Sequence, residues 1–275
     1  MIRRSFRQLT LLALVPAVLL AVYNVALSAA MPNQAELGQL LKERELTPSG
    51  AGDQFAILGL MFGRAIPVVL VFVVLATVVN AFVYMASLFI AVRDADGQPS
   101  TAAEGLRFAR SVALPAIGWG VLAWVVVTIG YFLFFIPGLY LNVVLFSSLA
   151  GVVAIERAGI SRCFQLIKDR FWATFGRLAI AALIMIAYFV ALMVVLLLVG
   201  GLLGLAFTAL GGAGGTPSPG GPSFGFVAVV AVVQAALLVP LSLFTVAVAT
   251  VTYAELRFRE NPSTSTATLA RELAR

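Results

Sequence analysis

The chain has 275 residues, of which 61% are hydrophobic and only 11% are charged, and its mean hydropathy is +1.05. A soluble domain carries roughly 25% charged residues, so this composition excludes a water-soluble fold and indicates that lipid surrounds most of the chain. The net charge of +6 does not indicate nucleic-acid binding, because the basic residues lie in short strips between apolar runs.

Six apolar stretches are long enough to cross about 30 Å of hydrocarbon as helices. We therefore expect an all-α polytopic membrane protein with cytoplasmic amphipathic helices, folded as a single transmembrane domain over residues 1–275. The predicted spans cover roughly residues 9–30, 65–92, 112–135, 139–155, 179–208 and 226–252.

The basic residues between the spans predict the orientation. Alternate segments carry 3, 3, 5 and 4 basic residues, against 2, 0 and 0 in the others. Because Lys and Arg are retained on the cytoplasmic side, both termini are predicted to be cytoplasmic. Only two of the 18 basic residues are lysines, as is typical of a GC-rich bacterial genome, so the membrane is predicted to be a bacterial cytoplasmic (inner) membrane. The basic-rich segments are residues 1–8, 93–111, 154–179 and 253–275; the others are 31–54, the Pro137-Gly138 turn and the linker 209–225.

Two features of the first half have alternative interpretations. Residues 1–30 have a basic start, an apolar middle and a small-residue end, like a signal peptide, but the apolar run is longer than a typical h-region. We expect an uncleaved anchor; cleavage would leave five spans. Arg64 interrupts the next apolar run, and we expect residues 55–64 to lie along the outer interface, with the span beginning near Ala65. The alternative is a functional arginine within the membrane.

The segment "AIERAGISRCFQLIKDRFWATFGRLA", residues 154–179, is an island of charge between apolar stretches. On a helical wheel its apolar and aromatic residues share one face and Arg162 lies opposite. Residues 160–178 are thus predicted to form a cytoplasmic surface helix, with its rings towards acyl chains and its arginines among phosphates. For Glu156 and Arg157 the alternative is a helix end that simply meets water. The candidate lipid- or partner-binding residues are Glu156, Arg157, Arg162, Phe164, Lys168, Arg170 and Trp172.

Similar starts precede other spans and suggest a pseudo-repeat of a surface helix followed by a two-span hairpin. Thr101-x-x-Glu104 fits a capping box, and residues 261–273 resemble that segment. Tyrosines 131 and 140 are expected at the outer face, and Trp172 and Tyr253 beside the cytoplasmic charges. Four polar residues within spans are expected to form hydrogen bonds between helices or to line a polar substrate path: Asn24, Asn80, Asn142 and Gln234.

The sequence contains few of the residue types and motifs that catalysis requires. The sequence contains no histidine and a single cysteine, Cys163, and it contains no P-loop, GxSxG or HExxH pattern. It therefore lacks the commonest general base and the commonest zinc ligand. A cation beside Cys163 could lower the thiol pKa, but a thiol enzyme is not expected without a histidine base. We expect no enzymatic activity, no metal and no cofactor.

Several motifs of the second half recur in a known family: Ile136-Pro137-Gly138-Leu139-Tyr140-Leu141, Glu156, Ser161-Arg162-Cys163-Phe164-Gln165-Leu166, Phe171-Trp172, Phe175-Gly176 and "TYAELRFRE" at 252–260. Through these residues the second half resembles the glycerophosphoryl-diester-phosphodiesterase membrane-domain type family of bacterial membrane proteins. The resemblance implies a six-helix membrane module, which some relatives fuse to a soluble barrel that carries the phosphodiesterase activity. This chain has no histidine to supply that barrel's catalytic histidines, so the resemblance implies no such activity here. Cys163 replaces the serine expected after the arginine.

These observations favour a non-catalytic membrane module that organises or recruits lipids or partner proteins at the cytoplasmic leaflet. The expected partners are the bilayer with its anionic headgroups and a membrane protein or further copies of the chain, not nucleic acid. The alternative is a transporter or lipid-handling permease. A cavity lined by Asn80, Asn142 or Gln234 would favour that alternative, and a close-packed centre would exclude it.

Overall fold

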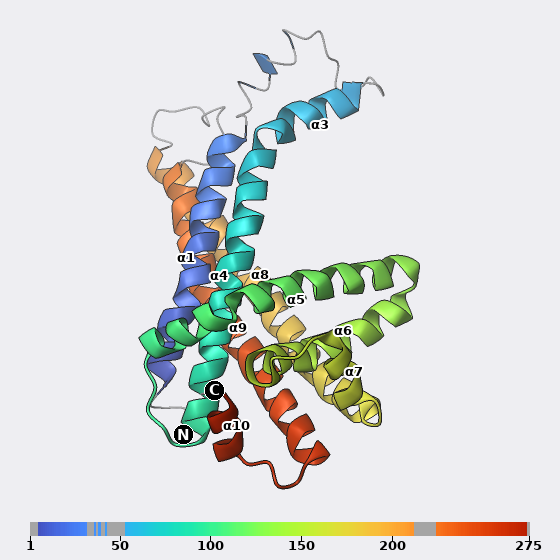
Figure 1. Ribbon diagram of the computed structural model, residues 1–275. Coiled ribbons are helices and arrows are strands. Elements are labelled where there is room, and N and C mark those ends of the chain that lie inside the picture. Colours follow the sequence, from blue (N-terminus) through green and yellow to red (C-terminus); the bar gives the residue numbers. More distant parts are fainter. Residues whose placement is uncertain are drawn as a thin grey trace. The chain divides into compact units, whose positions relative to one another are not determined.

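The computed structural model describes residues 5–31, 36, 38–39, 42, 53–211 and 224–273, and every regular element among them is a helix (Figure 1). Six of these helices are long and apolar enough to cross a membrane, which confirms an all-α polytopic membrane protein. Most of the predicted linker 209–225 lies outside the described residues. The helices are α1 (Phe6–Ala30), α3 (Asp53–Gly63), α4 (Ala65–Ala95), α5 (Ala102–Leu133), α6 (Phe135–Gly151), the π-helix η1 (Val152–Glu156), α7 (Ile160–Ile167), α8 (Phe171–Gly211), α9 (Phe224–Glu260) and α10 (Thr266–Leu273).

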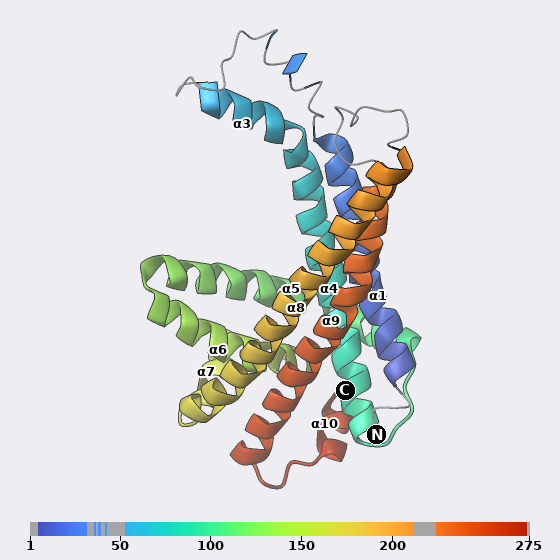
Figure 2. The same ribbon diagram turned by 180° about the vertical axis from the view of Figure 1, so that it is seen from behind.

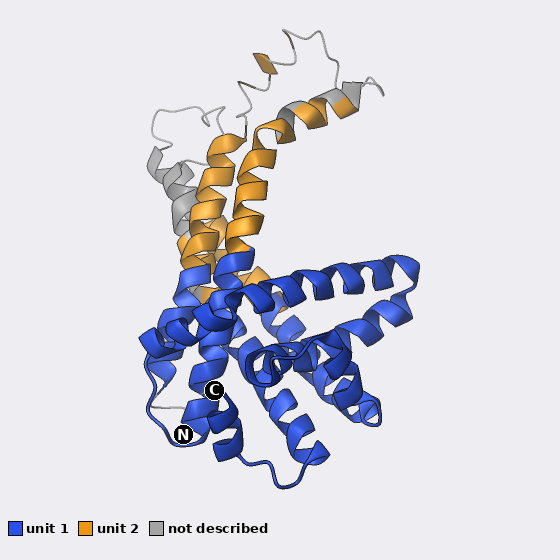
Figure 3. Cartoon of the chain, in the orientation of Figure 1, with its two compact units in different colours: residues 1–16, 77–189, 239–275 blue, residues 17–76, 190–238 orange. Residues whose placement is uncertain are grey.

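The chain divides into two compact units (Figure 3). Unit 1 comprises residues 1–16, 77–189 and 239–275, and unit 2 comprises residues 17–76 and 190–238. Helices α1, α4, α8 and α9 contribute to both units, whereas α5, α6, α7 and α10 belong to unit 1 alone. Neither unit is therefore a continuous stretch of sequence, and the single domain over residues 1–275 stays a prediction.

The apolar core of unit 1 holds together the helix ends that carry charged residues. Ala86 of α4, Val112 of α5, Val144 of α6 and Ile167 of α7 are completely buried in one cluster. Leucines of the short helix α10 complete this cluster. The two charged short helices, α7 and α10, are thus held by packing against protein, at an upper value of roughly 1.5–3 kcal/mol for each large apolar side chain buried.

Helix α5 begins as predicted, with a capping box. The Thr101 hydroxyl accepts a hydrogen bond from the Glu104 amide at 3.3 Å, and the Glu104 carboxylate accepts one from the Thr101 amide at 3.2 Å. The Gln8 side chain accepts a further bond from the Ala102 amide. These bonds satisfy amide groups that have no partner within the helix. Helix α5 then runs without a break to Leu133, so the predicted surface segment and the span that follows it form one continuous helix.

Helices α5 and α6 form a close hairpin whose turn is the extended residue Phe134. The predicted turn at Pro137-Gly138 is wrong, because a proline is tolerated in the first turn of a helix and both residues lie inside α6. A Cβ atom at Gly138 would come within 2.5 Å of the Tyr131 ring, so glycine is what permits this contact. Figures 1 and 2 show the hairpin extending away from the unit 1 part of α4.

The charged island does not form one surface helix. Helix α7 ends at Ile167, residues 168–170 form a turn, and α8 begins at Phe171. Cys163, Leu166 and Ile167 are buried in the core of unit 1. The prediction that the apolar face of residues 160–178 lies against acyl chains is therefore wrong for α7, because the chain folds back and α7 packs beside α6.

Unit 2 contains an expected polar contact and an expected helix break. The Asn24 amide of α1 donates a hydrogen bond to the Gln234 carbonyl of α9 at 3.4 Å, as predicted for polar residues within spans. Helix α3 ends at Gly63 and α4 begins at Ala65, which confirms the predicted start of that helix. Arg64 lies in the turn between them and pairs with Glu36.

Candidate functional site

The candidate site lies where α6 ends. The π-helix η1 widens the last turn, and the following residue, Arg157, has a left-handed backbone with φ of 53°. The Ala158 amide donates to the Val152 carbonyl at 3.3 Å across this wide turn. The next residue, Gly159, packs on the Trp119 ring, and a Cβ atom there would lie 2.5 Å from it. Such π-turns are frequent at functional sites; here the turn redirects the chain into α7.

Glu156, the last residue of η1, is the centre of an ion-pair cluster. Its side chain is only 13% exposed. One carboxylate oxygen accepts a hydrogen bond from Arg162 Nε at 2.6 Å, and the other accepts one from the Tyr253 hydroxyl at 2.9 Å. The predicted alternative, in which the charges of Glu156 and Arg157 simply meet water, is therefore wrong for Glu156. A buried carboxylate of this kind requires such partners.

Arg162 and Arg257 connect Glu156 to the C-terminal helices. Arg162 donates two hydrogen bonds to Glu260 of α9, at 2.8 and 2.7 Å. Arg257 of α9 donates to Glu272 of α10 at 3.0 Å and lies 3.6 Å from Glu156. Two-pronged Arg–carboxylate pairs fix geometry as well as charge. The ion-pair cluster, which comprises Glu156, Arg162, Tyr253, Arg257, Glu260 and Glu272, thus ties η1, α7, α9 and α10 together.

The cluster also stabilises the charged form of Arg162. Its hydrogen bonds with Glu260, opposed by partial burial and reinforced by Glu156, raise the pKa of the guanidinium above its already high ordinary value. By contrast, burial raises the pKa of the Cys163 thiol on the same helix, and this outweighs the lowering effect of Arg162. The neighbouring cation therefore does not lower the pKa of this thiol below its ordinary value, and a buried neutral thiol is a poor nucleophile.

A row of aromatic rings continues from the cluster along α7 and α8. The Tyr140 ring lies 6.2 Å from Phe164 and 4.9 Å from Phe171, measured between ring centroids. The Phe171 ring lies 5.5 Å from Trp172, which is 79% exposed. These distances are far shorter than the about 30 Å of a hydrocarbon core. The prediction that Tyr140 and Trp172 lie at opposite faces of the membrane is therefore wrong.

The predicted site residues fall into two groups. Glu156 and Arg162 belong to the ion-pair cluster, and Phe164 packs in the aromatic row. Arg170 donates a hydrogen bond to the Arg259 carbonyl. The exposed residues are Arg157, Lys168 and Trp172. Sequence reasoning missed the partners on α9 and α10, although their acidic residues, opposite in charge to the arginines of the island, were the available signal.

Arg157 lines a polar cleft of about 350 Å3 together with Ile155, Glu156, Arg257 and Glu272. Its guanidinium lies 5.8 Å from the centre of the Phe108 ring, a cation–π distance. In the part of the chain that the structure describes, Arg157 forms no ion pair with a carboxylate. The cleft therefore presents a guanidinium that is oriented by an aromatic ring and is able to bind an anionic oxygen.

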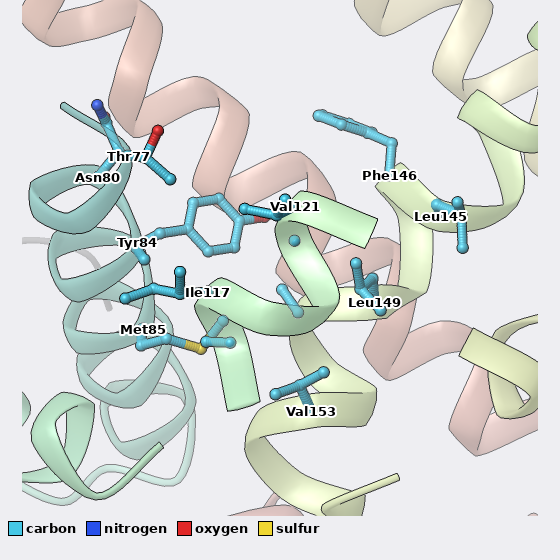
Figure 4. A pocket seen from close by; sticks show the side chains of 14 residues that line it. Thr77, Asn80, Tyr84, Met85, Ile117, Val121, Leu145, Phe146, Leu149 and Val153 are labelled. Atoms are coloured by element: carbon cyan, nitrogen blue, oxygen red, sulfur yellow. The ribbon is translucent and has the colours of Figure 1, made fainter. Parts of the chain in front are cut away.

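A second cavity, of about 370 Å3, lies between α4, α5 and α6 and is lined mainly by apolar side chains (Figure 4). Its polar lining comes from α4, where Thr77, Asn80 and Tyr84 recur at helical spacing. Figure 4 shows the Tyr84 ring reaching from α4 towards Val121 of α5. Cavities of this size with a few convergent polar groups are typical ligand sites.

No family model, no curated protein and no solved structure matches this chain. The resemblance to the glycerophosphoryl-diester-phosphodiesterase membrane-domain type family therefore stays a prediction, and the site must be interpreted from its own geometry.

Proposed function

We propose that this protein is a non-catalytic membrane module of the bacterial cytoplasmic membrane, with both termini in the cytoplasm, that binds anionic lipid headgroups at the cytoplasmic leaflet. The observation that supports this most is that the basic residues at the charged end of unit 1 have two different roles. The ion-pair cluster uses Arg162 and Arg257 to fix the helices, whereas Arg157 stays exposed beside a polar cleft.

The chemistry of Arg157 suits a phosphate group. A guanidinium offers several N–H donors to phosphate oxygens, and its stacking on Phe108 holds it in place. Lys168, in the turn before α8, and Trp172, in its first turn, are exposed and are residue types that favour the headgroup region. Each basic residue near an anionic leaflet contributes about 1 kcal/mol.

Lipid binding by the purified protein tests this proposal. Native mass spectrometry in detergent would count the phosphatidylglycerol and phosphatidylcholine molecules that remain bound to wild type, to Arg157→Gln and to Arg110→Gln. Arg110 is an exposed arginine on α5 and serves as the charge-matched control. We expect Arg157→Gln alone to weaken phosphatidylglycerol binding about fivefold, as the loss of one guanidinium–phosphate hydrogen bond of about 1 kcal/mol implies. Equal effects of the two variants, or no preference for phosphatidylglycerol in wild type, would contradict the proposal.

A lipid-handling permease is the second candidate, because Asn80 lines the cavity between α4, α5 and α6. Gly120 lies on the cavity wall, and a Cβ atom there would meet no neighbour within 4 Å, so Gly120→Leu adds a side chain at this wall with no clash at its Cβ atom. A permease predicts that proteoliposomes transfer a fluorescent lipid between leaflets and that Gly120→Leu slows this transfer. If wild-type vesicles transfer lipid no faster than empty ones, this candidate is excluded.

A further inference from the structure

The α5–α6 hairpin lies in an unexpected place for a pair of membrane spans. Its turn, Phe134, is followed within a few residues by Tyr140, whose ring contacts Phe164 of α7 and Phe171 of α8. We propose that the hairpin does not cross the bilayer. It enters the bilayer from the side that holds the ion-pair cluster, here called the charged side, and returns to that side. Its tip lies among the acyl chains of that leaflet. The chain then crosses the membrane through α1, α4, α8 and α9.

The start of α8 gives the depth reference. Phe171 directly follows Lys168, Asp169 and Arg170, and the first two of these residues are exposed. Exposed charged side chains are expensive within hydrocarbon, so this turn lies at the level of the headgroups. Since the Tyr140 ring lies 4.9 Å from the Phe171 ring, the first part of α6 lies near the same level.

The hairpin tip cannot be far from that level. The segment of α6 from Phe134 to Tyr140 rises only about 9 Å at 1.5 Å per residue. A crossing needs about 30 Å, and half of it is about 15 Å. Even if this segment pointed straight along the membrane normal, the turn would stay within or near one leaflet. The side chains at Tyr140 and Phe171 add too little length to reach the other face.

Two backbone amides of the turn are already paired, which lowers the cost of burying it in hydrocarbon. The Phe134 amide donates to the Gly130 carbonyl at 3.1 Å, and the Gly138 amide donates to the Phe134 carbonyl at 3.3 Å. Pro137 has no amide hydrogen to satisfy.

The side chains of the tip fit acyl chains. Residues 111–155 contain no charged residue. Phe132 is 88% exposed and Phe134 is 72% exposed, so the described residues leave both rings largely uncovered. Rings that project from a hairpin without charges, at a depth of less than half a bilayer, are most simply covered by lipid. The tip therefore forms a lipid-binding surface specific to one leaflet.

The charge pattern of the sequence is equally consistent with this topology. The basic segments that flank the hairpin, residues 93–111 and 154–179, lie on one side of the membrane whether the hairpin crosses and returns or turns within the leaflet. The turn carries no charge, so the rule for basic residues cannot place it. Both topologies also leave the two termini on the same side.

Single-cysteine labelling in reconstituted vesicles of known orientation distinguishes the two topologies. Cys163→Ala removes the native thiol, and cysteine is then placed at Phe134, at Pro262 on the charged side, or at Arg64 next to the start of α4. Leu114→Cys, at an exposed position of α5, is the control for a site in hydrocarbon. We expect a membrane-impermeant maleimide to react at Arg64 and Pro262 from opposite sides. We expect it to react at Phe134 and Leu114 only after detergent is added.

A spin label at the same positions then measures depth. We expect the label at Phe134 to be accessible to oxygen but not to a water-soluble nickel chelate, and to lie between the bilayer centre and the Pro262 face. Maleimide labelling of Phe134→Cys from the Arg64 side would show that the hairpin crosses. Labelling from the Pro262 side would place the tip in water, and close spin–spin coupling between two copies would show that a second chain covers it. Each of these three results would overturn the proposal.

Discussion

The contact between α6 and α9 depends on the absence of a side chain at Gly151. A Cβ atom there would lie 2.2 Å from Cγ and 2.3 Å from Cδ1 of the Tyr253 ring. No neighbouring atom can remain that close, so Gly151→Ala must displace the ring or separate the helices. Gly176 on α8 is the matched control, because a Cβ atom there would meet nothing within 4 Å.

The expected loss of stability has two parts. Overpacking of a core contact costs about 1–3 kcal/mol. Displacing the ring also breaks the hydrogen bond from the Tyr253 hydroxyl to the Glu156 carboxylate, and hydrogen bonds to charged groups contribute about 1.5–3 kcal/mol. We therefore expect Gly151→Ala to lower the free energy of unfolding by about 3 kcal/mol or more. Gly176→Ala should be neutral or stabilise the helix by up to about 1 kcal/mol.

The single cysteine supplies the assay. Cys163 is completely buried in the core of unit 1, and burial raises the pKa of its thiol. A thiol-reactive fluorophore can therefore label it only when this part of the protein opens. A loss of about 3 kcal/mol raises the open population, and with it the labelling rate in detergent, by more than about 100-fold. A Cys163→Ala variant gives the background signal.

Equal labelling rates for Gly151→Ala and Gly176→Ala would refute this reasoning, because they would show that α6 and α9 do not approach through Gly151. A second variant keeps the test specific. Tyr253→Ala removes the ring that the new methyl group meets, so the double variant Gly151→Ala/Tyr253→Ala should be less destabilised than the sum of the two single variants.

Three further predictions concern the same unit. Arg162→Gln removes a hydrogen bond from the largely buried Glu156 carboxylate and should lower the free energy of unfolding by about 2 kcal/mol in the Cys163 labelling assay. Glu260→Gln changes a more exposed carboxylate and should lower it by less than about 1 kcal/mol. Equal losses would contradict the assigned burial. Thr101→Ala removes the cap of α5 and should cost about 1 kcal/mol, seen as faster amide exchange in the first turn of that helix and not in α8. Stability should fall as pH rises above about 8.5, because the unfolded Cys163 thiol then loses its proton while the buried thiol, with its raised pKa, keeps it. The midpoint of unfolding followed by tryptophan fluorescence between pH 7 and 10 checks this, and an identical pH dependence in Cys163→Ala would disprove it.

Much of the fold was predictable from the sequence because lipid imposes simple requirements. A helix that crosses hydrocarbon must be long and apolar, so six apolar stretches predicted the six long helices correctly. Local signals were equally direct. The Thr101-x-x-Glu104 pattern predicted the capping box that starts α5, and the break at Arg64 predicted the start of α4. Each of these depends on neighbours in the sequence or on the bulk solvent.

The candidate site was only partly predictable, because it is assembled from distant segments. Glu156 and Arg162 were identified from the charged island, but their partners on α9 and α10 follow about a hundred residues later. Charge patterns reveal that such residues exist, not which of them meet. The apolar stripe of residues 160–167 was correctly recognised, but its partner was assumed to be lipid and is the protein core.

The sequence by itself determined that this protein resides in a membrane, where α4 and α5 begin, and which strips carry its charge, because helix formation and partition into lipid are local free energies. Only the tertiary structure decided that α7 packs against the core of unit 1, that Glu156 is largely buried in an ion-pair cluster, and that Tyr140 lies beside Phe171. Acyl chains and protein interiors are equally apolar, so hydrophobicity alone cannot distinguish them. Close packing and paired charges determine which apolar residues contact protein instead of acyl chains. Both require residues that the chain brings together only when it folds.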